Sequence, residues 1–595
     1  MNNKRTAFLI SALAAATLVA CGGPSAFTLS GEVIDGYIEG ATVCLDENGD
    51  GVCSVNEPRA VTTAGGKFSL SVQGSTDGKF LVVDIPATAK DSDDGGKTLA
   101  DAGKSAYVMA TPASLPQVIT PLTTLMVGKV KADGVSLNEA RERVLDELGL
   151  PATTDLHADH VKASDVQVHA MARQVAARLQ ESKKAPDSTA TDLLTSLASK
   201  LKDQDSALGQ LVTPSPSNLV NMPSDLAQVA DGKLLLYKMI SAKGQPIVAS
   251  AMLFTPKAAA PSAGRPLVVL GVGTTGIAGK CAPSNIMQGY AVLPYESLVK
   301  QLIGSGIAVV MPDYEGRGPA KVTGLPDAHP YLHVGSAGNS MVLAAVASKR
   351  LLGNALSGVW AAWGHSQGGH AALAAAQFAS LGERLEPALD YRGAVAVAPA
   401  SHFVEAVQGL IAKSGEDIKA QKVPDAFGTL GTLGFYASYI VQGSSYTASP
   451  IDPTKVLGAQ VQAAHISAKS DCSDDYYLKI EKAINDFAMM GGQPQNFGAV
   501  DVQQITSPQV TAALRSLEPG RVKLPGKTLL VQGSADQTVL PVTTQALEQV
   551  MKAKGSTVSL TLVNGAQATH SGVLSTTEAQ QAMLAHLTAL LSPAK

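Results

Sequence analysis

The stretch "WAAWGHSQGGHAALAAA", residues 360–376, joins two kinds of predicted secondary structure through a short glycine-rich turn. "VWAAW" predicts a strand, and "GHAALAAAQF" predicts a helix. The turn between them, "GHSQG", places Ser366 between Gly364 and Gly368 and fits the pattern G-x-S-x-G. A nucleophile elbow requires small neighbours, because its serine is strained and the next helix packs closely. A flexible glycine turn is the alternative, but the two flanks favour Ser366 as a nucleophile.

Two later residues supply what a serine nucleophile needs. A serine hydroxyl reacts well only when a histidine base, oriented by a carboxylate, removes its proton. In hydrolases with this elbow the chain order is serine, acid, histidine. Asp536 follows the apolar run "KTLLVQG", and His570 follows "VSLTLVNGA". We therefore predict a triad of Ser366, Asp536 and His570, with a helix-capping turn aspartate as the alternative role for Asp536.

Three other histidines lie near the predicted site or after it in the chain. His365 and His370 flank the serine but come too early in the chain order, so we interpret them as packing residues. His586 lies in a predicted amphipathic helix near the end of the chain. His570 is therefore the preferred base.

An oxyanion hole requires two backbone N–H groups near the nucleophile. One is expected from Gln367, the residue after the serine. The other is expected from the loop "GVGTTGIAGKCAPS", residues 271–284. We assign it to Thr275, with Thr274 as the alternative.

The sequence after Val220 alternates fully apolar runs with helical segments. The runs are "PLVVLGV", "GIAVVMP", "GVWAAWG", "GAVAVA", "KTLLVQG" and "VSLTLV". Strands that are apolar throughout are expected in a mostly parallel sheet covered by helices on both faces. The fold class is therefore α/β, with a hydrolase domain over 225–595. Residues 400–522 interrupt the rhythm and predict a helical cap.

Several motifs in this region resemble the secretory lipase family of α/β-hydrolases, the fungal lipase-A group and its bacterial relatives. They are "GTTGIAGKCAPS", "MPDYEGRG", "GHSQGGHAAL", "QGSADQTVLP" and "ATHSGV". The resemblance covers about residues 225–591 and implies the same triad, with Thr275 as an oxyanion donor. Val272-Gly273 stands where lipases often have His-Gly, which is a departure from the family pattern next to that donor. The N-terminal third has no counterpart in the fungal enzymes.

The chain contains five cysteines. If Cys21 carries lipid, two pairs remain, as expected for an exported protein. Cys44 and Cys53 are the natural local pair, which leaves Cys281 with Cys472 by elimination. The resemblance also supports this second bridge, which would tie the oxyanion loop to the cap.

The first residues are typical of an export signal. "MNNKRTAFLISALAAATLVACGG" has a basic start and an apolar stretch over 7–20, too short for a typical spanning helix of about 20 residues. We predict a signal peptide over 1–20. "LVAC" resembles a bacterial lipobox with Cys21 as the acylated residue, and Gly22 favours the outer membrane. An ordinary signal peptide cut nearby, with Cys21 incidental, is the alternative.

Residues 21–111 predict a small β-sandwich-like domain, because short β-like runs alternate with Gly and Asp turns. The turn "DENGDGVCSVNE" has oxygen-bearing residues at the spacing of a calcium loop, at Asp46, Asn48, Asp50 and Glu57. Both flanks look like strands, whereas EF-hands lie between helices. The alternative is a hairpin turn clipped by the local cysteine pair. Either reading gives the loop a structural role.

Residues 112–212 predict a helical region, followed by a linker over 213–224. "SLNEARERVLDELGLP" has Ser136 and Glu139 at capping-box spacing and ends on "GLP". "TPSPSN" is typical of a linker. His157, Asp159 and His160 could suggest a metal site, but they fall in a loop beside solvent-type residues.

Composition limits the classes of function. The 595 residues exceed what one hydrophobic core serves, so two or three domains are expected. Hydrophobic residues make up 45% and charged residues 16%, which is typical of globular proteins. The formal net charge is −4 without a long basic run, which argues against nucleic acid as a partner.

These observations predict a serine carboxylic-ester hydrolase of the lipase or esterase type, which acts through an acyl-enzyme. We expect a monomer whose catalysis needs no cofactor, with structural calcium possible only in the N-terminal region. Its expected location in the cell is the outer membrane, on the periplasmic or cell-surface face. Two rivals stay open: a serine peptidase of the prolyl-oligopeptidase type, and a surface binding protein whose hydrolase domain is inert.

Overall fold

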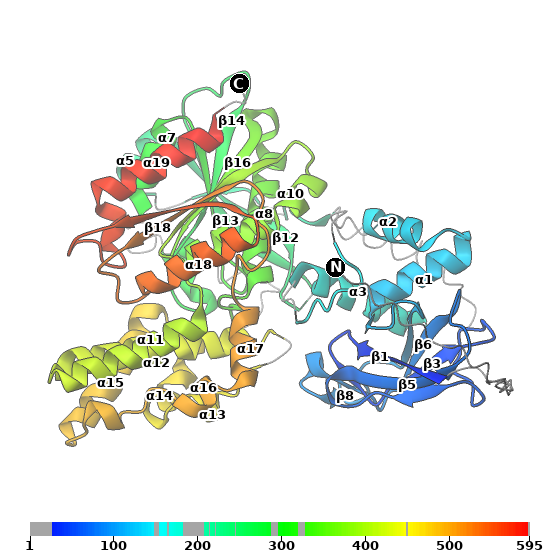
Figure 1. Cartoon of the computed structure of the whole chain (residues 1–595). Helices are drawn as coiled ribbons and strands as arrows, with labels where there is room; N and C mark the ends of the chain where they lie inside the picture. Colours follow the sequence, from blue (N-terminus) through cyan, green and yellow to red (C-terminus); the bar gives the residue numbers. More distant parts are fainter. Residues whose placement is uncertain are drawn as a thin grey trace, which may run out of the picture.

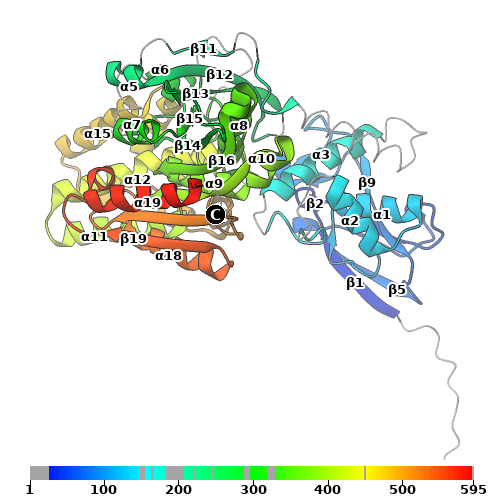
Figure 2. The ribbon, with the colours of Figure 1, turned by 90° about the horizontal axis from the view of Figure 1, so that it is seen from above.

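The computed structural model describes most of the chain. The described residues are 26–147, 154–162, 166–182, 207–212, 215–219, 222–243, 245–286, 295–318, 328–447 and 450–592. The predicted signal peptide and Cys21 lie outside them. Figures 1 and 2 show a large C-terminal part built on one sheet and a smaller N-terminal part beside it.

A nine-stranded sheet forms the centre of the C-terminal part, in the order β11-β12-β13-β15-β14-β16-β17-β18-β19. The antiparallel end contains β11 (Ser217–Asn218), β12 (Ala230–Ile240) and β13 (Pro246–Pro256). The parallel strands are β15 (Ala308–Pro312), β14 (Arg265–Gly271), β16 (Leu356–His365), β17 (Asp390–Val397), β18 (Lys527–Gly533) and β19 (Thr557–Val563). The predicted mostly parallel α/β sheet is thus confirmed.

Helices cover both faces of this sheet. On one face α8 (Val334–Leu352) packs against α9 (Gln367–Gln377) and the central strands. On the other face lie α7 (Glu296–Gly304) and α19 (Thr577–Leu591), as Figure 2 shows. Because both faces are covered, the central strands are buried along nearly their whole length, which explains their continuous apolar runs.

The sheet begins earlier in the chain than the predicted domain start at residue 225. Ser217 and Asn218 of β11 pair with Leu234 and Lys233 of β12, and the Val212 N–H donates to the Leu236 carbonyl. The predicted linker therefore contains an edge strand of the sheet. A short polar strand can fill this role because backbone groups alone satisfy the hydrogen bonds of β12.

The cap is inserted between β17 and β18, as the sequence predicts. Its elements are α11 (Phe403–Lys419), α12 (Val423–Ser444), α13 (Pro453–Val456), α14 (Ala459–His465), α15 (Ser473–Met489), α16 (Val502–Ile505) and α17 (Pro508–Ser516). These helices enclose a core of their own beneath the sheet (Figure 1).

The N-terminal part contains small, mostly antiparallel sheets. One has the order β10-β1-β5, with β1 (Ala26–Val33), β5 (Lys67–Gln73) and β10 (Val118–Ile119). Another has the order β4-β3-β6-β9, with β3 (Thr42–Asp46), β4 (Arg59–Val61), β6 (Phe80–Ile85) and β9 (Tyr107–Pro112). A third joins β2 (Ile38–Glu39), β7 (Lys90–Asp91) and β8 (Lys97–Thr98).

The strands and the predicted helical region share a single hydrophobic core. Helices α1 (Pro121–Asp133), α2 (Leu137–Glu147) and α3 (Val166–Ser182) contribute buried residues to the same cluster as β1, β5, β6 and β9. The helices therefore belong to the β-region, and α3 also contacts α8 of the C-terminal part. Among the described residues, no helix is long and apolar enough to cross a membrane.

Candidate active site

Ser366 lies in the turn between β16 and α9 and has a strained backbone. Its φ is 58° and its ψ is −119°, a conformation that residues with a Cβ rarely adopt. The glycines around it are required by close packing. A Cβ on Gly364 would lie 1.9 Å from the Gly368 carbonyl oxygen, and a Cβ on Gly368 would lie 1.9 Å from the Gly271 carbonyl oxygen. A strained serine between close-packed glycines is what the predicted nucleophile elbow requires.

His570 and Asp536 meet at the carboxyl edge of the sheet. Asp536 follows β18, and His570 follows β19. The His570 Nδ1 lies 2.7 Å from the Asp536 Oδ2. The Asp536 side chain is fully buried, whereas 16% of the His570 side chain is exposed. A buried carboxylate thus holds a partly exposed imidazole.

Backbone groups hold the Asp536 carboxylate in place. Its Oδ1 accepts hydrogen bonds from the N–H groups of Thr538 and Val539 at 2.8 and 2.9 Å, and the Gln532 Nε2 donates to Oδ2. Burial by itself raises the pKa of Asp536. The contacts with His570 and with the two N–H groups outweigh burial and lower that pKa below its usual range. Asp536 is therefore ionised at neutral pH.

Contacts of the residue before the serine place His570 beside the elbow. The His365 ring lies 4.7 Å from the His570 ring, centroid to centroid, and the His365 Nε2 lies 2.9 Å from the His570 carbonyl oxygen. The structure therefore brings the loop that carries His570 against the elbow that carries Ser366.

The end of β14 and the start of the loop after it lie against the same turn, because a Cβ on Gly368 would lie 1.9 Å from the Gly271 carbonyl oxygen and 2.9 Å from that of Val272. The Thr275 hydroxyl donates to the Cys281 carbonyl at 2.7 Å and accepts from the Arg317 Nη1 at 2.6 Å. The Thr274 hydroxyl pairs with the Tyr331 hydroxyl at 2.7 Å. Because both hydroxyls hold the loop, an oxyanion contact here would come from a backbone N–H, as would one from Gln367, the first residue of α9.

Arg317 and Asp313, both in "MPDYEGRG", form hydrogen bonds with this loop. Arg317 is fully buried; its Nη1 also donates to the Gly276 carbonyl at 3.0 Å, and burial lowers its pKa to about 10. Asp313 accepts from the Ser284 N–H at 2.8 Å and from the Ser284 hydroxyl at 2.6 Å. Both follow an apolar strand at the carboxyl edge, where charged residues are a signal of a site.

The cap is joined to the same loop. The predicted disulfide between Cys281 and Cys472 is present, with Cα atoms 5.3 Å apart. The Ser473 N–H donates to the Thr275 carbonyl at 3.0 Å, and Gly276 forms an isolated β-bridge with Cys472. The start of α15 is therefore attached to the loop that carries Thr275.

An apolar pocket opens on Ser366 beneath the cap. Its empty volume is about 590 Å³, including the space at its mouth. Most lining residues are apolar; besides Ser366, they come mainly from α11 and α12, and the rest from the segments before α8, after β17 and after β18 and from α18 (Pro541–Ala553). Among them are Leu332, Val407, Leu433, Ala437, Ile440 and Val539.

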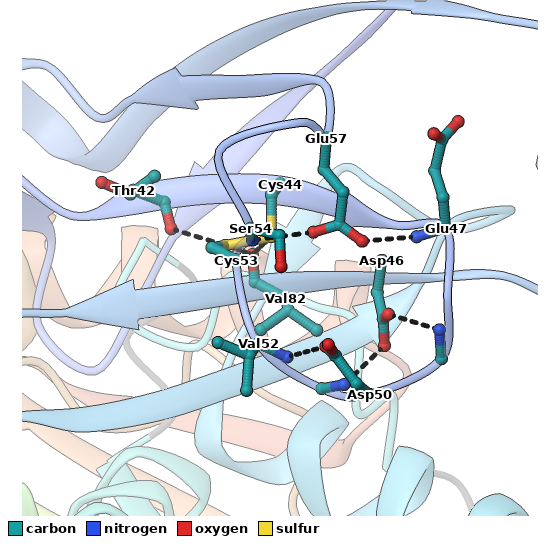
Figure 3. The surroundings of a disulfide bond; sticks show 12 residues. Thr42, Cys44, Asp46, Glu47, Asp50, Val52, Cys53, Ser54, Glu57 and Val82 are labelled. Atoms are coloured by element: carbon teal, nitrogen blue, oxygen red, sulfur yellow. Dashed lines mark hydrogen bonds between the residues drawn. A yellow bond between two sulfur atoms is a disulfide. The ribbon is translucent and has the colours of Figure 1, made fainter.

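The predicted calcium turn joins β3 and β4 and is closed by a disulfide between Cys44 and Cys53 (Figure 3). Its carboxylates accept hydrogen bonds from the backbone of the turn itself. Asp46 accepts from the N–H groups of Gly49 and Gly51 at 2.7 and 3.0 Å. Glu57 accepts from the N–H groups of Glu47 and Ser54, both at 2.9 Å.

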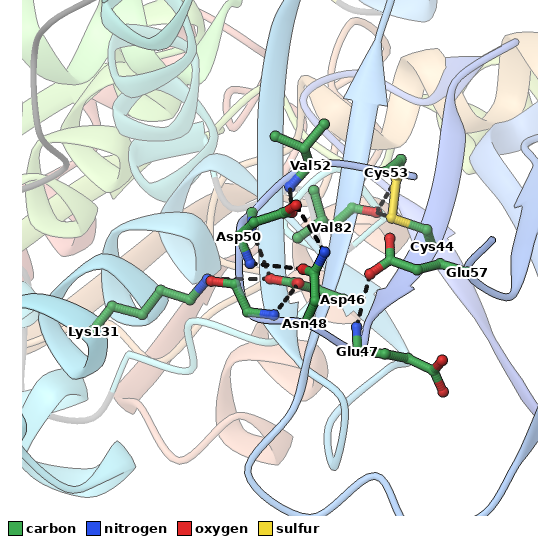
Figure 4. Close-up of polar contacts among 12 residues, drawn as sticks. Cys44, Asp46, Glu47, Asn48, Asp50, Val52, Cys53, Glu57, Val82 and Lys131 are labelled. Carbon is green, nitrogen blue, oxygen red and sulfur yellow. Dashed lines mark hydrogen bonds and ion pairs between the residues drawn. A yellow bond between two sulfur atoms is a disulfide. The ribbon is translucent and has the colours of Figure 1, made fainter. Parts of the chain in front are cut away.

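A lysine supplies the positive charge beside this turn. The Lys131 Nζ of α1 lies 3.2 Å from the Asp46 Oδ2 and 3.3 Å from the Gly49 carbonyl oxygen (Figure 4). Asn48 and Asp50 bond to each other at 2.8 Å. In the part of the chain that the structure describes, no three or more His, Cys, Asp or Glu side chains are grouped to hold a metal. In this structure the carboxylates of the turn are bonded to backbone N–H groups and to Lys131, and calcium binding here stays a prediction.

The histidines near residue 160 lie deeper than a solvent-facing loop would place them. His160 is 2% exposed, its ring lies 5.2 Å from that of His169, and burial lowers its pKa to about 3. Asp159 accepts a hydrogen bond from the Tyr37 hydroxyl at 2.9 Å. These residues join the helices to the strands of the N-terminal part.

Comparisons with solved structures give matches that cover part of the chain. The chain is similar to the rice cell wall degrading esterase LipA from Xanthomonas oryzae, at 19% identity and a TM-score of 0.45, over 65% of this chain and 97% of that one. It is also similar to lipase A from Candida antarctica, at 15% identity and a TM-score of 0.44, over 61% and 79%.

A hydrolase from Legionella pneumophila matches at 16% identity and a TM-score of 0.44, over 64% of this chain and 98% of that one. Neither the protein-family models nor the curated proteins gave a match to this sequence. The strand order, the elbow after β16 and the cap between β17 and β18 show the fold by themselves. The C-terminal part of the chain has the α/β-hydrolase fold with a helical cap.

Proposed function

We propose that the chain is a serine hydrolase of carboxylic esters, with Ser366, Asp536 and His570 as its triad. The observation that carries this proposal is the contact between the His570 Nδ1 and the buried Asp536 carboxylate, beside a strained serine turn. A carboxylate on Nδ1 leaves Nε2 as the nitrogen that can take the serine proton.

The proposed reaction has two steps. His570 removes the proton of the Ser366 hydroxyl while the Ser366 oxygen attacks the ester carbonyl. His570 then gives this proton to the alcohol, which leaves. Water, activated by His570, then releases the acid from the acyl-enzyme. The N–H groups of Gln367 and Thr275 would stabilise the negative charge on the carbonyl oxygen in both steps.

The pocket supports an acyl ester as the substrate. It opens at Ser366, and its walls are mostly apolar, so an acyl chain would leave water on binding there. A charged or strongly polar acyl group would lose its hydration without gaining partners of opposite polarity. We therefore favour fatty-acyl esters over peptides.

The test is a comparison of Ser366→Ala with the wild-type protein on p-nitrophenyl esters and on aminoacyl-anilides. We expect ester turnover in the wild type, and its fall by at least about 10³-fold in the variant, because the nucleophile is lost. A fluorophosphonate probe should label only the wild-type protein. Ester turnover that survives in Ser366→Ala would overturn the triad, and preferred cleavage of anilides would favour the peptidase.

Membrane anchoring through Cys21 is a separate proposal that rests on the lipobox-like sequence. Acylation of Cys21 would attach the protein to the outer membrane. The full-length Cys21→Ser variant should move from the membrane fraction to the soluble fraction of exporting cells. Membrane association that persists in this variant would contradict the anchor.

A further inference from the structure

His365 connects the two loops that meet at the proposed nucleophile. It is the last residue of β16, and only 5% of it is exposed. One ring nitrogen, Nε2, lies 2.9 Å from the His570 carbonyl oxygen. The other, Nδ1, lies 3.3 Å from the Tyr295 hydroxyl, which in turn accepts the Gly273 N–H at 3.0 Å.

The partners determine which nitrogen of His365 carries the proton. A carbonyl oxygen only accepts, so Nε2 must donate to His570. Burial lowers the pKa of His365 to about 3, so the ring is neutral and carries one proton. Nδ1 is therefore an acceptor, and the hydroxyl of Tyr295 donates to it. Burial raises the pKa of Tyr295 to about 12, so this hydroxyl keeps its proton.

The result is a continuous chain of hydrogen bonds with a single direction. It runs from the Gly273 N–H to Tyr295, from Tyr295 to His365, and from His365 to the carbonyl of His570. Gly273 precedes the two threonines of the oxyanion loop. These three hydrogen bonds therefore attach the loop that carries Gly273 and the loop that carries His570 to the end of β16.

We propose that His365 is a positioning residue that holds the backbone of His570, so that its ring stays aligned between Ser366 and Asp536. This inference rests on the proposed function. His365 touches no substrate in this role; it acts through the carbonyl of His570 and, by way of Tyr295, through Gly273.

His370 offers a matched control on the other side of the serine. His370 is fully buried, and its Nε2 lies 2.9 Å from the backbone carbonyl oxygen of Leu517. Leu517 follows α17 of the cap and lies outside the loops that carry the triad. Replacing either side chain removes one bond to a carbonyl, but only the His365 side chain is bonded to a triad residue.

The experiment compares His365→Phe, His365→Gln, His370→Phe and His370→Gln on a p-nitrophenyl ester. We expect His365→Phe to lower kcat by roughly 10–100-fold with little change in KM, because a misplaced base slows chemistry more than binding. His365→Gln keeps an N–H donor and should recover most of kcat. Both His370 variants should keep the kcat of the wild type.

Equal kcat in His365→Phe and the wild type would overturn the proposal, as would equal losses in His365→Phe and His370→Phe. Should His365→Phe fail to fold, Tyr295→Phe replaces it, with a several-fold fall in kcat expected at unchanged KM; a wild-type kcat would then overturn the proposal. Ser366→Ala, assayed in parallel, separates this outcome from failure of the proposed function.

Discussion

The Ser366 backbone shows how a single residue can store strain at a site. A positive φ in a residue with a Cβ costs on the order of 1–3 kcal/mol, and the surrounding structure must compensate for it. The Ser366 N–H donates to the Val397 carbonyl at 2.9 Å, and its own carbonyl accepts from the His370 N–H at 3.1 Å. These bonds, together with the glycine contacts, hold the turn in its strained form.

Asp35, in the N-terminal part, is a buried carboxyl group close to other carboxylates. It is buried, and the Tyr107 hydroxyl donates to its Oδ2 at 2.8 Å. Burial first, and then the nearby Asp91 and Asp93 carboxylates, raise its pKa from 3.8 to about 7, against the opposing effects of Tyr107 and the Lys104 ammonium. Asp35 is therefore largely protonated below neutral pH.

The raised pKa predicts how the stability of this part depends on pH. In the unfolded chain Asp35 ionises near pH 4, whereas in the folded chain it ionises near pH 7. The folded chain binds this proton more tightly than the unfolded chain does. The stability gained from the protonated Asp35 is therefore fully present below pH 4 and is lost as the pH rises to about 7. Asp35→Asn should remove this loss and stabilise β9 and α3 at pH 8 by on the order of 2 kcal/mol.

Hydrogen exchange of β9 and α3 at pH 5 and pH 8 provides the measurement. The exposed Asp77→Asn in the same region is the control, and it should leave the pH dependence as it is in the wild type. If Asp35→Asn shows the same loss of protection between the two pH values as the wild type, the assignment to Asp35 is wrong.

At the scale of elements, the disulfide between Cys281 and Cys472 joins the proposed oxyanion loop to the cap. Replacing both cysteines by serine should loosen Thr275 and lower kcat on a short ester by roughly tenfold, because the oxyanion donors lose their alignment. The measurement is steady-state turnover, with thiol-free buffers used throughout.

The second disulfide is the matched control. Cys44→Ser with Cys53→Ser should destabilise the N-terminal part by about 2–3 kcal/mol, since a short covalent loop is opened, and should leave kcat unchanged. If kcat falls equally in both double variants, the alignment of the proposed oxyanion loop does not depend on the Cys281–Cys472 disulfide.

Helix α12 provides a test of the acyl pocket. Ala437 faces this pocket and is 4% exposed, so Ala437→Trp would fill space that a long acyl chain requires. Turnover of long-chain esters should fall at least about tenfold relative to that of short-chain esters. Leu478→Trp, on the exposed side of α15, is the control and should leave the ratio unchanged. Equal losses on all chain lengths would place the acyl group elsewhere.

At the scale of the whole molecule, the proposed triad lies in the C-terminal part and the predicted calcium turn lies in the N-terminal part (Figure 1). The triad belongs to the C-terminal sheet, and the turn lies between β3 and β4. Addition of EDTA should therefore leave ester turnover unchanged, because the proposed chemistry uses only side chains and water. Turnover that falls with EDTA and returns with calcium would contradict this separation.

The sequence determined the local chemistry of this protein. The order of Ser366, Asp536 and His570 after three apolar runs could be predicted, because strands and tight turns depend on nearby residues. The capped α/β fold was predicted on similar grounds, and the two cysteine pairs were predicted from one local pair and elimination; the structure confirms both.

Only the tertiary structure decided the other contacts between distant groups. The interpretation of His365 as a packing residue missed its contact with the carbonyl of His570, which comes 205 positions later. The Lys131 contact with Asp46 and the shared core of strands and helices were missed for the same reason. Local patterns encode strands, helices and turns, whereas contacts between remote segments depend on how the finished elements pack.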